Sequence, residues 1–247
     1  MAESGTSWRV LVAPIALHCG ALEGRVIFDD AGVVFQVDRW KDKPIQRMVL
    51  HTGGPTAKLS PLQVTESYIR GSDLVATFAR IPPYQIAPQV YWRAREFPEF
   101  AAVGVEMILS MQTDLLDSIP RTTVSSTAPG ATFFYTNSLA NRPLQAVDDR
   151  VFDRQNSTEN LFLMRNHPED LSYAELVHPP DFVSAEVFHD EHERPSAIQS
   201  TLFPERLEKG VIRRARICGW FMPAENDLAT AVELAKRFVD EPPPLTT

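Results

Sequence analysis

The segment Tyr91-Trp92-Arg93-Ala94-Arg95-Glu96-Phe97-Pro98-Glu99-Phe100 leads directly into the apolar run Ala101–Thr113. Both parts are rich in aromatic, β-branched or other apolar residues, and the Pro98-Glu99 step between them suits a turn. Long stretches of this kind are typical of paired antiparallel strands. The two segments therefore predict a hairpin and, with it, a mainly β protein.

The two faces of this hairpin differ in chemistry, because successive side chains of a strand point to opposite sides of a sheet. With a turn at Pro98-Glu99, one face carries Trp92 opposite Val105 and is predicted to lie in the core. The other face carries, in cross-strand pairs, Tyr91 opposite Glu106, Arg93 opposite Gly104 and Arg95 opposite Ala102. Two arginines beside small residues leave room for a planar polar ligand, since a guanidinium group binds carboxylates, phosphates and paired hydroxyls.

Further strand-like segments recur on both sides of this hairpin, separated by residues that favour turns. They are Trp8–Pro14, Arg25–Asp29, Val33–Arg39, Gln46–His51, Val64–Arg70, Leu74–Ile81, Ala131–Thr136, Asn160–Arg165, Leu171–His178, Phe182–His189, Ala197–Phe203 and Val211–Met222. We also expect Asp29-Asp30-Ala31-Gly32 to join the second and third of these as a hairpin.

One segment has helical spacing instead, with apolar residues three and four positions apart from Leu228 to Val239. Asn226 or Asp227 can cap its first turn, and Pro242-Pro243-Pro244 ends it, so a helix is expected over about 226–240. We therefore predict a large antiparallel β-sandwich with a short C-terminal helix, built as a single domain over residues 1–247.

The arginine residues have two interpretations, which the sequence leaves open. Val211–Met222 is apolar on both faces, so Arg214 and Arg216 lie on a strand that is buried on both sides and need acids or a ligand as partners. Arg93 and Arg95 can likewise pair with acids such as Glu96, Glu99 and Glu106. The predicted ligand-binding residues are Tyr91, Arg93, Arg95, Glu106, Arg214 and Arg216.

The histidine residues suggest two kinds of chemistry. His178 has a suitable pKa for a general acid or base, and Glu106, Glu175 and Glu186 are its candidate carboxylate partners. The run His189-Asp190-Glu191-His192-Glu193 resembles a metal-binding segment in composition, but it matches no established zinc spacing. We predict no metal and no cofactor, and the nucleotide-binding and serine-hydrolase signatures do not occur.

The charge balance disfavours two classes of partner. Lys and Arg total 24 against 32 Asp and Glu, for a formal charge of -8, whereas nucleic acids and anionic membranes attract positive charge. The two cysteines, Cys19 and Cys218, are predicted to be free thiols. The early apolar run Val10–Leu17 is too short to span a bilayer and contains Pro14, so a cytoplasmic location is expected.

The stretch from Phe203 to Arg216, and the aromatic and arginine strand that begins Tyr91–Ser118, resemble uncharacterised bacterial proteins of the galactose mutarotase-like, or supersandwich, group. The resemblance implies two large twisted antiparallel sheets, with a concave face that binds a saccharide. It also implies several outcomes, because this group contains aldose epimerases, polysaccharide lyase domains and non-catalytic modules. An epimerase uses a histidine and a carboxylate as base and acid.

Three functional hypotheses follow. The first is a carbohydrate-binding or carbohydrate-processing protein, of aldose-epimerase or lyase type if it is an enzyme, whose ligand is a saccharide or an acidic sugar. The second is a non-catalytic interaction or assembly domain, with homo-oligomers left open. The third is a metal-dependent hydrolase that uses His189 and His192.

Overall fold

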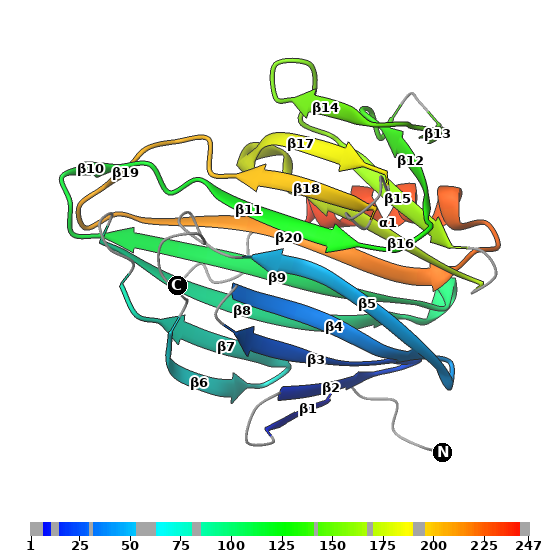
Figure 1. Cartoon of the computed structure of the whole chain (residues 1–247), viewed down its shortest axis with the longest axis horizontal. Helices are drawn as coiled ribbons and strands as arrows, with labels where there is room; N and C mark the ends of the chain where they lie inside the picture. Colours follow the sequence, from blue (N-terminus) through cyan, green and yellow to red (C-terminus); the bar gives the residue numbers. More distant parts are fainter. Residues whose placement is uncertain are drawn as a thin grey trace.

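The structure is a computed structural model, and it describes residues 7–10, 15–29, 32–52, 63–80, 85–140, 143–166, 170–189 and 196–242. Two large antiparallel sheets account for most of these residues (Figure 1). The predicted fold class, an antiparallel β-sandwich with a C-terminal helix, is confirmed. In the described part of the chain, no helix is long and apolar enough to cross a membrane.

Sheet A contains strands from both halves of the chain. In spatial order it consists of β1 (Ser7–Val10), β2 (Ile15–Cys19), β3 (Leu22–Asp29), β4 (Gly32–Trp40), β5 (Lys43–Thr52), β11 (Thr122–Thr127), β18 (Ala197–Leu202), β17 (Phe182–Phe188) and β14 (Arg150–Asp153). Asp29 pairs with Gly32, as the predicted β3–β4 hairpin requires, while residues 30–31 lie outside the described ranges.

Sheet B holds the long strands that the opening hairpin predicts. Its order is β13 (Gln145–Ala146), β12 (Thr132–Thr136), β15 (Leu161–Asn166), β16 (Leu171–Val177), β20 (Ile212–Pro223), β9 (Ala102–Thr113), β8 (Ile86–Phe97), β7 (Asp73–Phe78) and β6 (Val64–Arg70). A separate two-stranded pair, β10 (Asp117–Ser118) with β19 (Leu207–Glu208), lies at one tip of the molecule.

The main core lies between the two sheets. Inward-facing residues of both sheets fill it, and β8 contributes alternate side chains such as Val90, Trp92 and Ala94, as the period of two predicts. A second apolar cluster lies on the opposite, outer face of sheet B, under the helix α1 (Asp227–Asp240). Strand β20 contributes to both clusters, with Ile217 on one side and Trp220 on the other, so the prediction that it is buried twice is confirmed.

Helix α1 packs on the part of sheet B formed by β15, β16 and β20 (Figure 1). It buries Ala231, Leu234, Ala235 and Phe238, which share one face at helical spacing. The helix bounds match the prediction, but the predicted side-chain cap at Asn226 is wrong. Asn226 makes no capping hydrogen bond and has a positive φ of 58°, while the buried Asp227 carboxylate accepts hydrogen bonds from Arg165 and Ser172 instead.

The predicted register between β8 and β9 is wrong by two residues, although the assignment of the two faces is correct. Arg93 lies opposite Glu106 rather than Gly104, and Arg95 lies opposite Gly104 rather than Ala102. The turn is longer than expected, because Pro98–Phe100 forms a short 3-10 helix that Ala101 closes in the left-handed conformation, with a φ of 48°. Proline fits the first position of such a helix, whereas it does not suit a two-residue hairpin turn.

Candidate functional site

The candidate site lies on the outer face of sheet B, where β8, β9 and β20 run side by side. The pairing aligns Arg93 with Glu106 and Cys218 in one row, and Arg95 with Gly104 and Trp220 in the next. Because the rows belong to three neighbouring strands, residues that are far apart in the sequence become direct neighbours.

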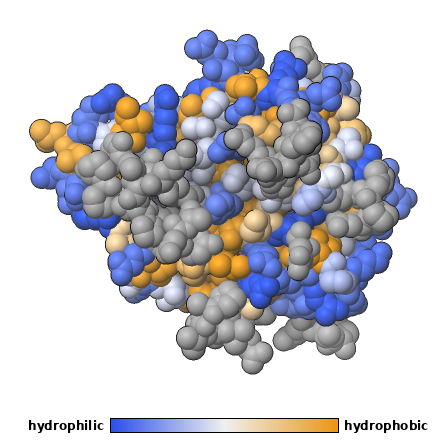
Figure 2. Space-filling model, viewed as in Figure 1, coloured by the Kyte–Doolittle hydropathy of each residue, from blue (hydrophilic) through white to orange (hydrophobic). Residues whose placement is uncertain are grey.

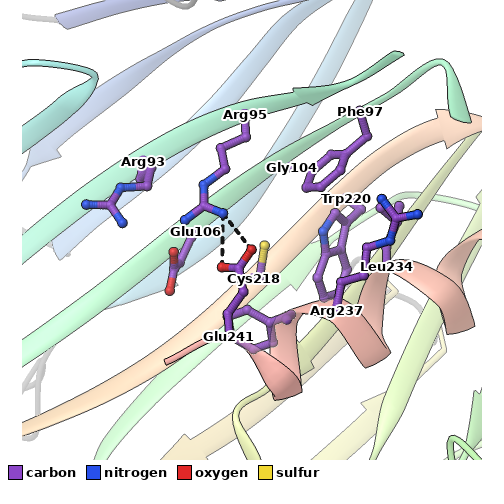
Figure 3. A pocket seen from close by; sticks show the side chains of 11 residues that line it. Arg93, Arg95, Phe97, Gly104, Glu106, Cys218, Trp220, Leu234, Arg237 and Glu241 are labelled. Carbon is purple, nitrogen blue, oxygen red and sulfur yellow. Dashed lines mark hydrogen bonds and ion pairs between the residues drawn. The ribbon is translucent and has the colours of Figure 1, made fainter. Parts of the chain in front are cut away.

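A cavity lies where this face meets the C-terminal end of α1 (Figure 3). It encloses about 330 Å³ when its open mouth is included, but only about 20 Å³ is free interior space. One end is polar, with Arg93, Arg95, Glu106 and Glu241, and the other is mostly apolar, with the Arg237 side chain beside it. The apolar end consists of Phe97, Trp220, Leu234 and Phe238.

Gly104 shapes the apolar end of the cavity. A Cβ atom at this position would lie 3.0 Å from Phe97 Cε2 and 3.0 Å from Trp220 Cδ1. The glycine therefore allows the two aromatic rings to close over the strand, and this brings an indole and a phenyl ring beside the charged groups.

Each arginine at the polar end has an acidic partner. Arg93 binds Asp73 of β7 through two hydrogen bonds, from Nε at 2.7 Å and from Nη2 at 2.6 Å, and this pair raises the pKa of Arg93. Arg95 uses Nη1 alone, which contacts both carboxylate oxygens of Glu241 at 2.7 and 2.9 Å (Figure 3). The interpretation in which these arginines pair with acids thus holds in this structure, although the acids are Asp73 and Glu241 rather than Glu96 or Glu99.

Arg216 is the most buried of the arginines, with 3% of the residue exposed. Its Nε donates to Glu106 Oε1 at 2.7 Å, its Nη1 donates to the Glu241 backbone oxygen at 3.2 Å, and its guanidinium lies 4.5 Å from the centre of the Phe238 ring. Its Nη2 is buried and has no hydrogen-bond partner among the described residues. A buried donor of this kind is costly unless a ligand or water satisfies it.

Similarity to solved structures supports the architecture. No family model matches the sequence, and no curated protein matches it. The structure is similar to a galactose mutarotase related enzyme from Lactobacillus acidophilus, with a TM-score of 0.54 and 8% identity over 85% of this chain and 97% of that one. It is also similar to the alpha-N-acetylgalactosaminidase NagBb from Bifidobacterium bifidum, with a TM-score of 0.53 and 12% identity over 88% of this chain and 37% of that one. The chain has the galactose mutarotase-like fold.

Within this fold, the six residues predicted to bind a ligand share one face of three adjacent strands. The cavity is lined by three of them, Arg93, Arg95 and Glu106. Arg216 does not line it but donates a hydrogen bond to Glu106. Tyr91 lies one row further along and donates its hydroxyl hydrogen to Gln89. Arg214 pairs in register with Ser110 and lines a different cavity of about 190 Å³ that includes Asp181 and Phe203.

The candidate catalytic residues are dispersed. Glu186 is exposed on β17 of sheet A, and Glu175 points from β16 into the core between the sheets. His178 packs against the Phe238 ring at 5.6 Å, and burial together with the nearby Arg216 lowers its pKa. Of these candidates, only Glu106 lines the cavity beside α1.

The carboxylate nearest His178 is one that the sequence did not single out. Asp181 Oδ2 lies 3.9 Å from His178 Nδ1 and accepts the backbone N–H of Arg216 at 2.9 Å. Burial raises the pKa of Asp181 to about 6. Sequence reasoning also missed Asp73 and Glu241, because neither belongs to a motif and both depend on cross-strand and helix–sheet contacts.

The hypothetical metal site is only partly described. His189 Nδ1 lies 2.7 Å from Asp149 Oδ1 and its ring packs on Phe133, whereas His192 lies outside the described residues. Over the described part of the chain, no group of three or more His, Cys, Asp or Glu residues could hold a metal ion. Cys19 and Cys218 are both buried and form no disulfide, as predicted, and burial raises the pKa of Cys218 well above its usual value.

Proposed function

We propose that this protein binds a carbohydrate on the outer face of sheet B, at the cavity between β8, β9, β20 and the end of α1. The observation that carries the proposal is the combination of guanidinium, carboxylate and aromatic groups around one cavity. A sugar ring presents hydroxyl groups at its edges and C–H groups on its faces. Charged side chains with several hydrogen-bonding atoms suit the edges, and aromatic rings suit the faces.

The similar proteins support the same class of ligand. One is a galactose mutarotase related enzyme and the other is an alpha-N-acetylgalactosaminidase. Because the identities are 8% and 12%, the likeness concerns the fold, and the local chemistry of the cavity has to carry the proposal.

An aldose-epimerase-like reaction is the finer form of this proposal. It needs a base and an acid near the same sugar, and Glu106 is a carboxylate at the cavity wall. His178 and Asp181 contact the Arg216 backbone; burial lowers the pKa of His178 and raises the pKa of Asp181 to about 6. Carbohydrate binding does not require these groups to act, so binding is the broader proposal.

A binding screen tests the proposal. Neutral monosaccharides, uronic acids and sugar phosphates are titrated into the wild type, and into the variants Arg95→Gln and Arg206→Gln. Arg206 is a matched control, because it pairs with Asp117 at the distant β10–β19 tip. We expect at least one sugar to bind the wild type and Arg206→Gln alike and to bind Arg95→Gln more weakly. Equal binding to all three proteins, or binding to none, would contradict the proposal.

An interaction function is the second candidate, and a different surface favours it. Leu115, Leu116, Ile119 and Ile212 are large apolar residues with 37%, 84%, 48% and 51% exposure near the β10–β19 tip, where Figure 2 shows apolar atoms at the edge of the molecule. Exposed apolar side chains that gather in one place often mark a contact surface. Sedimentation of the wild type and of Leu116→Ser tests this function, which predicts an assembly that the substitution dissociates.

We also propose that residues 1–247 form one domain, because the core between the sheets draws residues from Ile15 to Phe221. The cytoplasmic location stays a prediction from the sequence.

A further inference from the structure

The cavity as it stands is too small for a sugar. Its free interior of about 20 Å³ holds about one water molecule, whereas sites for small ligands usually measure about 300–1,000 Å³. Glu241 is one of the lining residues, and its carboxylate points at the Arg95 guanidinium (Figure 3). A ligand that enters between Arg95 and the aromatic end therefore has to displace Glu241.

Glu241 differs from the other acidic partners in where it comes from. Asp73 and Glu106 belong to strands of sheet B, whereas Glu241 follows the last residue of α1 in an extended conformation, with φ -70° and ψ 132°. Its backbone N–H binds Arg237 O at 3.0 Å and its backbone oxygen accepts from Arg216. Rotation of the Glu241 side chain can remove the carboxylate and leave both backbone hydrogen bonds in place.

The ion pair of Glu241 is also the most easily broken of the three. The side chains of Arg95 and Glu241 are 41% and 37% exposed, compared with 4% and 6% for Arg216 and Glu106 and 20% and 13% for Arg93 and Asp73. Arg95 offers a single nitrogen to both carboxylate oxygens, so the two-nitrogen edge of its guanidinium is not used. Exposed pairs of this kind contribute little to stability.

When the Glu241 carboxylate leaves, the site acquires an uncompensated positive charge. Arg93 keeps Asp73, Arg216 keeps Glu106, and Arg237 keeps Glu99 and Glu233. Arg95 then has no acidic partner among the described residues. The opened site therefore has one guanidinium that needs an anion, while the neighbouring arginines keep their own acids.

From this arrangement we propose that Glu241 is an internal stand-in for a ligand carboxylate, and that the site takes a carboxylate-bearing sugar whose acid group replaces Glu241 on Arg95. This inference rests on the proposed carbohydrate-binding function and defines its ligand class. The ligand carboxylate occupies the place of the Glu241 carboxylate, and the sugar ring extends toward Phe97 and Trp220. Glu241 then competes with the ligand and limits its affinity.

Titration calorimetry with matched sugars tests the inference. Galactose and galacturonate differ at C6, where one carries a hydroxymethyl group and the other a carboxylate, and galactose 6-phosphate tests a phosphate at the same position. The proteins are the wild type, Glu241→Gln, Arg95→Gln and the control Glu205→Gln, which removes the exposed carboxylate that pairs with Arg213 at 2.8 Å.

We expect Glu241→Gln to bind galacturonate about fivefold more tightly than the wild type does, the change that corresponds to an exposed ion pair of about 1 kcal/mol. Galactose should gain no affinity, Arg95→Gln should lose the preference for galacturonate, and Glu205→Gln should behave like the wild type. An equal gain for galactose and galacturonate, or a gain for the phosphate alone, would overturn the inference.

Two different results separate the role of Glu241 from carbohydrate binding itself. If galactose and galacturonate bind the wild type and Glu241→Gln with the same affinities, the protein binds sugars but Glu241 is not a stand-in, and only the inference falls. If none of the sugars binds any of the four proteins at high millimolar concentration, carbohydrate binding itself is wrong and the inference falls with it.

Discussion

Glu175 should make the stability of this protein depend on pH in the direction opposite to ordinary acid denaturation. Its carboxyl group is buried between the sheets, where the groups that bind it are neutral hydroxyls. Ser126 donates to Oε2 at 2.5 Å and Tyr173 donates to the same atom at 2.9 Å. Burial raises the pKa of Glu175 to about 7, since these hydrogen bonds offset only part of the loss of hydration.

The sign and size follow from proton linkage. Between the unfolded pKa of about 4.3 and the folded pKa, the folded protein holds a proton on Glu175 that the unfolded chain has released. The stabilisation is fully present below about pH 4.3 and is lost as the pH rises through about 7. The folded and unfolded pKa values differ by about 2.7, which corresponds to roughly 4 kcal/mol of unfolding free energy over the full titration.

The substitution Glu175→Gln removes this dependence and keeps the shape of the side chain. We expect the variant to gain roughly 3 kcal/mol over the wild type between pH 4.5 and pH 8, with most of the change between pH 5 and 7. Urea unfolding at closely spaced pH values measures it. Asp181, whose pKa is raised to about 6, acts in the same direction in both proteins and cancels in the difference.

Glu66→Gln on the exposed strand β6 controls for the loss of one negative charge. If the difference in unfolding free energy between the wild type and Glu175→Gln stays constant from pH 4.5 to pH 8, the reasoning about Glu175 is refuted. The same holds if that difference changes in the opposite direction.

Three further predictions follow from buried contacts. Gly219→Ala should destabilise the fold by about 2–4 kcal/mol in thermal or urea unfolding, because the new Cβ would clash with the Tyr173 hydroxyl oxygen, and an unchanged unfolding free energy would contradict this. Asp227→Ala should cost about 3 kcal/mol in the same assay, since it leaves Arg165 and Ser172 without their carboxylate, and Asp240→Ala at the other end of α1 is the comparison. Cys218 should react with a disulfide reagent only on unfolding, because its buried thiol has a raised pKa, and rapid labelling of the native protein would contradict this.

Much of the fold could be predicted because its signals are local. The alternation of apolar and polar residues in β8 and the helical spacing in α1 each depend on one segment, and both segments form the predicted elements. Strand β11 was missed because it carries no such local signal. Thr122–Thr127 is mostly serine and threonine and lacks an apolar pattern, yet it lies at the centre of sheet A between β5 and β18. Its Ser126 faces the core, where it binds Glu175.

The side-chain partners at the candidate site could not be predicted, because the paired residues are far apart in the sequence and no local pattern indicates that they meet. The period of two placed Arg93, Arg95 and Glu106 on one face correctly, even though the register was wrong by two residues. A shift by two preserves the faces and changes every pair, so the sequence could indicate which residues share a surface but not which acid meets which base.

Glu241 is the clearest case of a partner that only the fold reveals. It lies 146 residues from Arg95, and it reaches Arg95 because β20 leads into a helix that returns over its own sheet. Pro242 favours an extended backbone at the residue before it, and Glu241 adopts one, which directs its carboxylate away from the helix axis. The position of this carboxylate thus depends on two local features, the length of α1 and the proline after it. It also depends on the packing of α1 against sheet B, which brings Glu241 to Arg95. A substitution that lengthens the helix, such as Pro242→Ala, should therefore move Glu241 away from Arg95 and have the same effect on ligand affinity as removing its charge.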